Sequence, residues 1–371
     1  MRAHDLPVLT TRRRLVEIRR RMAEQGLAAV LISDPADIRY LTGFSGSAGR
    51  LALSAERAVL ATDGRYRSQA AEQLAGAGVR EAVEVVIDTV AGQRTALAAV
   101  LGPGEVALQA EAVTWSEARE WSQLLGREPA AVEGLLVEMR SVKDAAEVAR
   151  IEAAARVADQ ALADCRSLLG TGITERAFAR QLEHRMLTTG ADGLSFDTIC
   201  ASGPNAALPH ARPADRPIGP GDLVIVDFGA AVEGYRSDMT RTFHVGEPDD
   251  EAAAVLGVVT EAQRAGVATV GPDVPCFEVD RACRSVIEEA GMGEEFVHGT
   301  GHGVGLVIHE APWVNGSSAT VLAAGHVVTV EPGVYRPSFG GARVEDTVLV
   351  TAEGSRPLTH APKDPLVGVQ H

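Results

Sequence analysis

The stretch Leu223-Val-Ile-Val-Asp-Phe-Gly-Ala-Ala-Val-Glu-Gly-Tyr-Arg-Ser-Asp-Met-Thr-Arg-Thr-Phe243 decides the fold of the second half of the chain. Its pattern predicts a β-hairpin that turns near residues 232–234. The midpoint between Asp227 and Asp238 falls in this turn, so we expect the two aspartates to be cross-strand partners. Such partners lie about 4.5–5.5 Å apart on one face of a sheet. Two carboxylates this close need a proton or a cation between them, unless one aspartate belongs to the turn and faces solvent.

A second pair of carboxylates lies further along the chain. The apolar run V-V-T-V ends on Glu331, and Glu345 lies near the start of the next predicted strand. Ser338 is midway between these glutamates, inside a loop with proline and glycine, so they can again be cross-strand neighbours. The alternative is that Glu345 is a solvated edge residue beside Asp346. If both hairpins bury their carboxylates at one point, four carboxylates meet there.

Histidines are concentrated between the two predicted hairpins. The run V-H-G-T-G-H-G-V-G-L-V-I-H-E covers residues 297–310 and contains His298, His302 and His309. Its glycines permit positive φ and close backbone approach. Three histidines in one Gly-rich run, in a chain with 10, favour a functional site. His210 lies in a loop rich in proline and asparagine, and as a lone histidine it is weaker support for function.

Four carboxylates and one imidazole suit a pair of divalent cations. Oxygen-rich ligation favours Mn²⁺, with Co²⁺, Zn²⁺ and Fe²⁺ as alternatives, and it differs from a thiolate zinc site. Two such cations, about 3.5–4 Å apart, can activate water near neutral pH. They also balance the charge of the carboxylates. The 4 cysteines form no C-x-x-C pair, which favours buried thiols in a reducing compartment.

Strand and helix patterns alternate in the first part of the chain, which predicts an α/β layered domain. We expect strands at 28–33, 51–54, 58–62, 83–87 and 106–109, and helices at 12–25, 66–74, 89–101 and 114–125. Thr114 is the expected N-cap of the last of these helices. The pattern changes near residues 138–144, so we assign residues 1–138 to this domain and residues 139–371 to a second one.

The second domain is predicted to be α+β, with paired helices followed by hairpins. The motif S-V-K-D predicts a helix start at Ser141, and the Ala-rich pattern continues to about Leu169. Thr174 is the expected cap of the next helix, which continues to residue 188. We then expect strands at 195–201, 223–230 and 235–245, helices at 251–270 and 275–290, and Gly-rich strands and loops from residue 298 onward. This repeated order suggests an internal duplication.

Composition argues against several classes of function. The 371 residues include 50 acidic and 35 basic side chains, and the formal net charge of −15 argues against nucleic acid as a partner. No apolar run approaches the roughly 18 residues of a membrane span. Residues 1–21 are rich in arginine and lack the apolar core of a secretory signal. We therefore expect a cytoplasmic protein with no membrane partner.

Five of these residues carry a resemblance to a known family. Asp227, Asp238, His302, Glu331 and Glu345 occur in the contexts V-D-F-G, S-D-M-T-R-T, G-H-G-V-G, V-E-P-G-V-Y and R-V-E-D-T. These contexts resemble the metal-ligand motifs of the pita-bread metallopeptidases (family M24), and within that family the Xaa-Pro aminopeptidases and Xaa-Pro dipeptidases (prolidases). The similarity is strong over residues 140–352. Residues 10–135 resemble the family's creatinase-like N-terminal domain less specifically.

The resemblance implies a pita-bread catalytic domain with two bound divalent metal ions. Asp227 and His302 would bind one metal each, and Asp238 and Glu345 would bridge both. Glu331 would bind a metal and also act as the general base for the water that attacks the carbonyl before proline. These roles are carried over from the family and are consistent with the chemistry of the side chains.

The resemblance also implies residues that contact the substrate or support the metal ligands. His309 and His210 would contact the peptide and stabilise the tetrahedral intermediate. His298 would line the proline side of the pocket, and Tyr335 would lie near the metals. Arg343, two residues before a ligand glutamate, would point to the same face and hydrogen-bond a ligand carboxylate.

One position bears on the length of the substrate. A dipeptidase must bind the free carboxylate of proline, and some prolidases have an arginine shortly after the His-Glu pair. Trp313 occupies that place here and carries no charge. We therefore expect an Xaa-Pro aminopeptidase that acts on short peptides with proline at position two. The alternative is an Xaa-Pro dipeptidase in which Arg336 or Arg212 binds the carboxylate.

Three other functions fit the sequence less well. Creatinase-like amidinohydrolases share the architecture but need no metal, so the complete ligand set argues against them. Methionine aminopeptidases share the catalytic half, but the additional N-terminal domain fits them poorly. An inactive pita-bread module that binds proteins would be expected to lose ligands, and none is missing here. The family resemblance also implies a homodimer.

Overall fold

The computed structural model describes residues 6–369, which form two compact units. One unit comprises Val8–Arg140, and the other comprises residues 141–369 together with Leu6 and Pro7. Each unit contains its own cluster of buried hydrophobic side chains. Among the described helices, none is long and apolar enough to cross a lipid bilayer.

A six-stranded sheet with the order β4-β3-β2-β1-β5-β6 forms the centre of the first unit. β2 pairs with β1 and β3 in antiparallel fashion, whereas the other neighbours are parallel. The strands are β1 Ala29–Ile32, β2 Arg50–Ser54, β3 Ala58–Thr62, β4 Glu84–Ile87, β5 Val106–Gln109 and β6 Ala130–Val132. β1, β3 and β5 are buried along their whole length, as expected of strands that are covered on both faces.

Helices of this unit confirm most of the predicted pattern. They are α1 Arg12–Glu24, α2 Pro35–Thr42, α3 Arg67–Gly76, α4 Val90–Leu101, α5 Trp115–Leu125 and α6 Val137–Ser141. Thr114 caps α5 in a reciprocal capping box with Glu117, as predicted. The sequence reading missed α2, although Asp34 accepts a hydrogen bond from the Asp37 amide and Gly43 ends the helix with a φ of 76°. It also missed β6 and α6.

The second unit begins with a long helix whose start differs from the prediction. α7 spans Ala145–Cys165, and its N-cap is Asp144 rather than Ser141. The Asp144 carboxylate accepts hydrogen bonds from the backbone amides of Ala146 and Glu147. The Glu147 carboxylate in turn accepts a hydrogen bond from the Asp144 amide, which completes a capping box. A carboxylate at this position also interacts favourably with the helix dipole. The helix ends at Cys165 and continues as a 3₁₀ turn, so the predicted end near Leu169 was too late.

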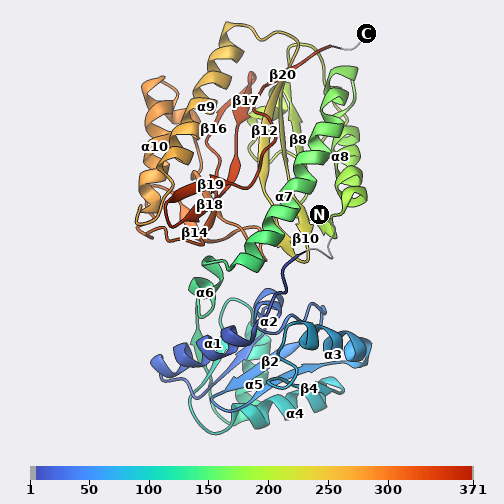
Figure 1. The fold of residues 1–371 in the computed structure, drawn as a ribbon, viewed down its shortest axis with the longest axis vertical. Helices are drawn as coiled ribbons and strands as arrows, with labels where there is room; N and C mark the ends of the chain where they lie inside the picture. The colour runs from blue at the N-terminus through green and yellow to red at the C-terminus, as the bar shows by residue number, and fades with distance from the viewer. Residues whose placement is uncertain (1–5, 370–371) are drawn as a thin grey trace. The chain divides into compact units, whose positions relative to one another are not determined.

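Two pairs of helices lie on opposite outer sides of the strands in this unit (Figure 1). α7 and α8 Glu175–Thr189 form one pair, and α9 Asp250–Thr269 and α10 Cys276–Glu289 form the other. The first pair packs on a sheet with the order β20-β12-β9-β8, and the second packs on a sheet with the order β14-β13-β15-β18-β19. Thr174 caps α8, as predicted.

The strands of this unit belong to four sheets and are shorter than predicted. They are β7 Gly193–Leu194, β8 Ile199–Ser202, β9 Leu223–Phe228, β10 Ala230–Val232, β11 Tyr235–Arg236, β12 Met239–Val245, β13 Gly301–Gly303, β14 Glu310–Val314, β15 Val327–Val330, β16 Gly333–Arg336, β17 Gly340–Arg343, β18 Asp346–Thr351, β19 Gly354–Pro357 and β20 Leu366–Val367. The predicted strands 223–230 and 235–245 are each divided in two, and of the predicted strand 195–201 only the part from Ile199 onward is a strand. The cause is that β7, β10 and β11 belong to a separate small sheet.

The first hairpin has a register that differs from the prediction. Asp227 pairs with Thr240, so Asp238 is its diagonal neighbour rather than its direct partner. The turn lies at Glu233 and Gly234, which have φ angles of 44° and 77° and therefore shift the centre of the hairpin by one residue. Each pairing partner moves by two residues, and because side chains alternate with a period of two, both aspartates remain on one face.

The second hairpin has the predicted register. Val330 pairs with Asp346, and Gly333 pairs with Arg343. The same register places Glu331 opposite Glu345 at the break between the two strand pairs. Glu331 is half-buried and Glu345 is buried, so the alternative of a solvated edge position for Glu345 is wrong.

Candidate metal centre

Three carboxylates from the two hairpins lie close together in the second unit of the chain. Single oxygens of Asp227, Asp238 and Glu345 all lie within 4.8 Å of one another. Asp227 is on β9, Asp238 directly precedes β12, and Glu345 directly precedes β18. Only 5% of Asp238 and 1% of Glu345 is exposed. The two hairpins therefore contribute to one cluster.

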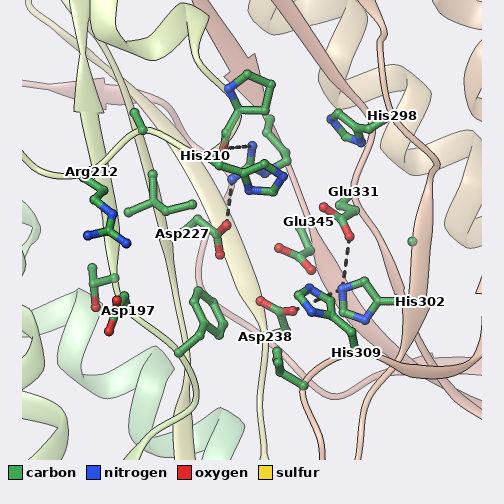
Figure 2. A pocket seen from close by; sticks show the side chains of 18 of the residues that line it. Asp197, His210, Arg212, Asp227, Asp238, His298, His302, His309, Glu331 and Glu345 are labelled. Atoms are coloured by element: carbon green, nitrogen blue, oxygen red, sulfur yellow. Dashed lines mark hydrogen bonds and ion pairs between the residues drawn. The ribbon is translucent and has the colours of Figure 1, made fainter. Parts of the chain in front are cut away.

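His302 and Glu331 complete this cluster (Figure 2). The Nε2 atom of His302 lies 3.6 Å from Asp238 Oδ2 and 3.4 Å from Glu331 Oε1. The Nδ1 atom of His302 donates to the Gly303 carbonyl at 3.0 Å. This hydrogen bond fixes the tautomer and leaves Nε2 with a lone pair directed at the carboxylates.

The carboxylates of the cluster repel one another in a buried environment. Burial, together with the neighbouring carboxylates, raises the pKa of Asp238 and of Glu345 well above the ordinary range. Burial likewise raises the pKa of Glu331 to about 7. These shifts show that the cluster, without a bound cation, resists full ionisation.

Two oxygens of the cluster have unused hydrogen-bonding capacity. Asp227 Oδ1 and Glu345 Oε1 are buried without a hydrogen-bond partner among the residues that the structure describes. Buried polar atoms without partners are rare in proteins, and a coordinated ion is one of the accepted reasons for them. The donor set of oxygen and one imidazole nitrogen fits hard or borderline divalent cations. The five residues therefore fit a divalent metal centre.

Arg343 lies directly behind the cluster and is buried. Its guanidinium donates to Asp227 Oδ2 at 2.7 Å, to Tyr335 Oη at 2.7 Å and to Thr240 Oγ1 at 3.1 Å. The first of these bonds occupies Oδ2 of Asp227, whereas Oδ1 has no hydrogen-bond partner among the described residues. The carboxylate is thus held in one orientation, which is the usual task of groups that surround a metal ligand.

Two threonines that sequence reasoning missed also orient the ligands. Thr240 donates to Glu345 Oε2 at 2.7 Å, and Thr329 donates to Glu331 Oε1 at 3.1 Å. Thr329 Oγ1 also accepts from the His302 amide at 3.0 Å. Thr240 is the cross-strand partner of Asp227, and Thr329 lies two residues before Glu331 in the chain. Their position in alternating strands was visible in the sequence, but their partners depend on the register.

The predicted histidines differ in how their ring nitrogens are used. His298 Nδ1 donates to the Gly299 carbonyl at 2.8 Å, and the Tyr335 hydroxyl lies 2.8 Å from Nε2. Burial lowers the pKa of His298 to about 4, so the ring is neutral and Nε2 accepts from the hydroxyl. Since both nitrogens are engaged, the His298 ring offers no unpaired nitrogen to a ligand. His309 packs edge-on against His302, with ring centroids 4.4 Å apart.

The cluster lies in a cavity of about 810 Å³. The cavity is lined by all five candidate ligands and by His210, His298, His309, Trp313 and Arg343. Tyr335 is not one of the lining residues but contacts two of them. Trp313 is 50% exposed, and its ring centroid lies 6.3 Å from that of His302.

The cavity is also lined by charged side chains that the sequence motifs did not indicate. Arg176, Arg180 and Glu183 come from α8, and Asp197 lies in the loop that precedes β8. Figure 2 shows Asp197 and Arg212 on the side of the cavity that lies away from His298 and His302. No short-range sequence signal marks Arg176, Arg180 and Glu183, because only the packing of α8 brings them to the cavity.

Comparison with known proteins adds independent information. The family described as metallopeptidase family M24 matches residues 149–352, and the creatinase/prolidase N-terminal domain matches residues 14–142. The uncharacterized peptidase YqhT of Bacillus subtilis is 37% identical over 355 residues, which cover 95% of this chain and 99% of that protein.

Solved structures resemble the whole chain. An Xaa-Pro dipeptidase from Bacillus anthracis has a TM-score of 0.91 and 36% identity, and the match covers 97% of this chain and 100% of that one. An X-Pro aminopeptidase from Thermotoga maritima has a TM-score of 0.85 and 33% identity, with coverage of 94% and 100%. The predicted fold class, a creatinase-type α/β domain followed by a pita-bread domain, is confirmed. This chain belongs to metallopeptidase family M24 and is a peptidase.

Proposed function

We propose that this chain hydrolyses the Xaa-Pro bond at the N-terminus of short peptides. The observation that carries the proposal is the buried cluster of four carboxylates and one imidazole, which opens into a cavity large enough for a small peptide. The titles of two similar structures, an Xaa-Pro dipeptidase and an X-Pro aminopeptidase, support the same substrate class.

Two divalent cations, Mn²⁺ in our proposal, would be held by Asp227, Asp238, His302, Glu331 and Glu345. When bound, they would supply a nucleophile at neutral pH and Lewis acidity towards the scissile carbonyl. Co²⁺, Zn²⁺ and Fe²⁺ remain the alternatives, since the same donor set accepts them.

The chain's own residues would bind the peptide and move protons. Glu331 would accept the proton of the attacking water, because it lines the cavity beside the other candidate ligands, with Oε1 3.4 Å from His302 Nε2. His309 and His210 line the cavity and would donate to the developing oxyanion. His298, whose nitrogens are both engaged, would pack its ring face against the proline side chain.

Two lining residues bear on the length of the substrate. Trp313 offers no charge to a carboxylate, which favours an aminopeptidase. Of the two arginines considered as carboxylate partners, Arg336 pairs with Glu251 and Glu295 and does not line the cavity. Arg212, in contrast, is exposed and lines it. This position favours dipeptides, so we propose dipeptidase activity alongside the aminopeptidase activity that Trp313 suggests.

A comparison of three substrates tests the proposal. The metal-loaded enzyme would be assayed with an Xaa-Pro dipeptide, its C-terminal amide, and an Xaa-Pro-Xaa tripeptide, with metal content measured in parallel. If Arg212 binds the carboxylate, Arg212→Ala raises KM for the dipeptide at least tenfold and leaves KM for the amide unchanged. Arg185→Ala, on an exposed part of α8 outside the cavity lining, is the matched control.

The outcome separates the alternatives. A preference for the tripeptide, with no effect of Arg212→Ala, would favour the aminopeptidase. A protein that stays inert towards all three substrates after Mn²⁺ is added would refute the proposed function and favour a binding module.

A further inference from the structure

A buried ion pair involves the residue that directly follows His309. The ammonium of Lys143 lies 2.8 Å from Glu310 Oε1, and only 1% and 9% of the two side chains are exposed. The backbone amide of Lys143 donates to the Gly325 carbonyl at 2.8 Å, and Val142 forms a β-bridge with His326. The lysine is therefore fixed by its backbone on one side and by the carboxylate on the other.

The carboxylate of Glu310 in turn holds the loop between β13 and β14. Its Oε2 atom accepts from the Val307 amide at 3.4 Å. Gly305 approaches so closely that a Cβ atom at this position would lie 2.3 Å from Glu310 Oε1. Gly303 and Glu310 are also paired across the two strands. The loop that carries His309 is thus closed around one buried carboxylate.

The choice of lysine at this position is unusual for this chain. Lys143 and Lys363 are the only lysines among 35 basic residues. Each pairs with a buried carboxylate, Lys363 with Asp346 at 2.5 Å. A compact ammonium fits where a planar guanidinium with five donors would leave donors unsatisfied. Lys143 is thus one of two lysines in an otherwise Arg-rich chain, and it is the more enclosed of the two, with 1% of its side chain exposed against 37% for Lys363.

We infer that Lys143 is a positioning residue that acts through Glu310 on His309. The ammonium holds the Glu310 carboxylate, the carboxylate holds the loop 303–307, and the loop sets the angle of the His309 ring against His302. Removal of one partner from a buried ion pair leaves an uncompensated charge, which the loop can relieve only by opening to water. The inference rests on the proposed role of His309 at the peptide.

A double-mutant cycle tests whether the effect passes through His309. In Lys143→Met we expect kcat for an Xaa-Pro peptide to fall ten- to hundredfold, with KM within twofold and metal content unchanged. In a His309→Gln background the same substitution should cause no further loss. Equal losses in both backgrounds would overturn the inference, because a general structural role acts independently of His309.

A second variant keeps the test informative if Lys143→Met folds poorly. Lys143→Met combined with Glu310→Gln leaves no unpaired charge, so we expect it to recover at least part of the lost kcat. Failure of the double variant to exceed Lys143→Met would contradict the inference. Lys363→Met is the matched control and should leave kcat within twofold, because Asp346 keeps Arg241, Gln263 and Thr359 as donors.

Amide hydrogen exchange gives a readout that does not depend on activity. In the metal-loaded full chain, we expect exchange within residues 303–310 to accelerate at least tenfold in Lys143→Met and to stay unchanged in Lys363→Met. If the wild-type enzyme is inert towards Xaa-Pro peptides, the proposed function fails while this measurement still decides the inference. Unchanged exchange in Lys143→Met would overturn it.

Discussion

Glu331 combines a position fixed by the β-hairpin with a pKa that is raised by burial. It follows β15 directly, faces Glu345 across the hairpin, and accepts a hydrogen bond from Thr329. Burial raises its pKa to about 7, although Arg343 opposes the shift. A carboxylate with these properties is suited to hold a cation and to exchange a proton near neutral pH.

Substitution of Glu331 by alanine should remove a metal ligand and the general base together. We expect kcat to fall by at least about 10²-fold, the lower end of the usual contribution of acid–base catalysis. Steady-state kinetics and metal analysis of Glu331→Ala would measure this loss. Glu289→Ala, at an exposed site on α10, should retain full turnover. Substantial turnover by Glu331→Ala would refute the assignment of the base.

His326 should make the stability of the catalytic unit depend on acidic pH. Burial and the nearby Lys143 lower the pKa of His326 to about 4, from the 6.5 expected in an unfolded chain. The neutral ring contributes its full stability above pH 6.5, and this contribution is lost as pH falls through the window from 6.5 to 4.

The variant His326→Asn should flatten this pH dependence. Asparagine can still accept from the Ala323 amide but cannot take up a proton. Thermal melting between pH 7 and pH 4 would show a smaller decrease of Tm in the variant than in the wild type. His184→Asn, at an exposed site on α8, serves as the control. An equally steep decrease in His326→Asn would contradict this assignment.

At the scale of elements, the hairpin β9–β12 shows why the aspartates could be grouped without a correct register. A shift of the turn by one residue moves each pairing partner by two, and two residues are one full period of a strand. The face was therefore predictable from alternation, although the direct partner was not. Glu233 and Gly234 have positive φ, and only the E-G dipeptide hinted at that turn.

Gly229, between β9 and β10, should be essential for the geometry of this hairpin. A Cβ atom at this position would lie 2.0 Å from the Ser237 carbonyl oxygen, and that oxygen belongs to rigid backbone. We expect Gly229→Ala to separate the strands that carry Asp227 and Asp238, and so to weaken metal binding at least tenfold. Isothermal titration calorimetry with Mn²⁺ would measure this loss of metal affinity.

A matched glycine shows what the same substitution does without a clash. Gly257 is exposed on α9, and a Cβ atom there meets nothing within 4 Å. Gly257→Ala should raise stability by about 0.5–1 kcal/mol, because alanine restricts the unfolded chain. Metal affinity in this variant should be unchanged. Equal affinities in both variants would show that the hairpin tolerates a Cβ at Gly229.

At the scale of the whole molecule, the two units have separate cores, and the five residues of the candidate metal centre all belong to one of them. The core of the first unit is formed by β1, β2, β3 and β5 with α4 and α5. All five candidate ligands belong to the second unit, where they join the two sheets. A bound cation therefore stabilises only the unit whose folded form creates its site.

Removal of the metal should have a local effect on stability. We expect a chelator to accelerate amide exchange in β9, β12, β13, β15 and β18, and to leave exchange in β1–β6 unchanged. The strands of the second unit lose the cation that offsets carboxylate repulsion, and those of the first unit have no ligand. Hydrogen exchange with mass spectrometry on the full chain would test this, and re-addition of Mn²⁺ is the control. Uniform acceleration in both units would refute it.

Caps were predictable where a single polar side chain satisfies the first turn. Thr89, Thr114 and Thr174 cap their helices through contacts within four residues, and each lies at the start of a predicted helix. The prediction that the long helix starts at Ser141 was wrong because a second candidate cap, Asp144, lies three residues further on. Asp144 accepts from two backbone amides, whereas Ser141 belongs to α6.

The sequence by itself determined the fold class, most of the elements in their order and the five residues of the candidate metal centre. These depend on local alternation, on caps and on motifs whose residues are close in sequence. The tertiary structure alone decided which side chains orient the ligands and which charges line the cavity. Thr240 and Lys143 acquire their partners from segments far along the chain, and Arg212 lines the cavity only once the chain is folded. Such positions follow from the packing of the sheets and helices rather than from any local pattern.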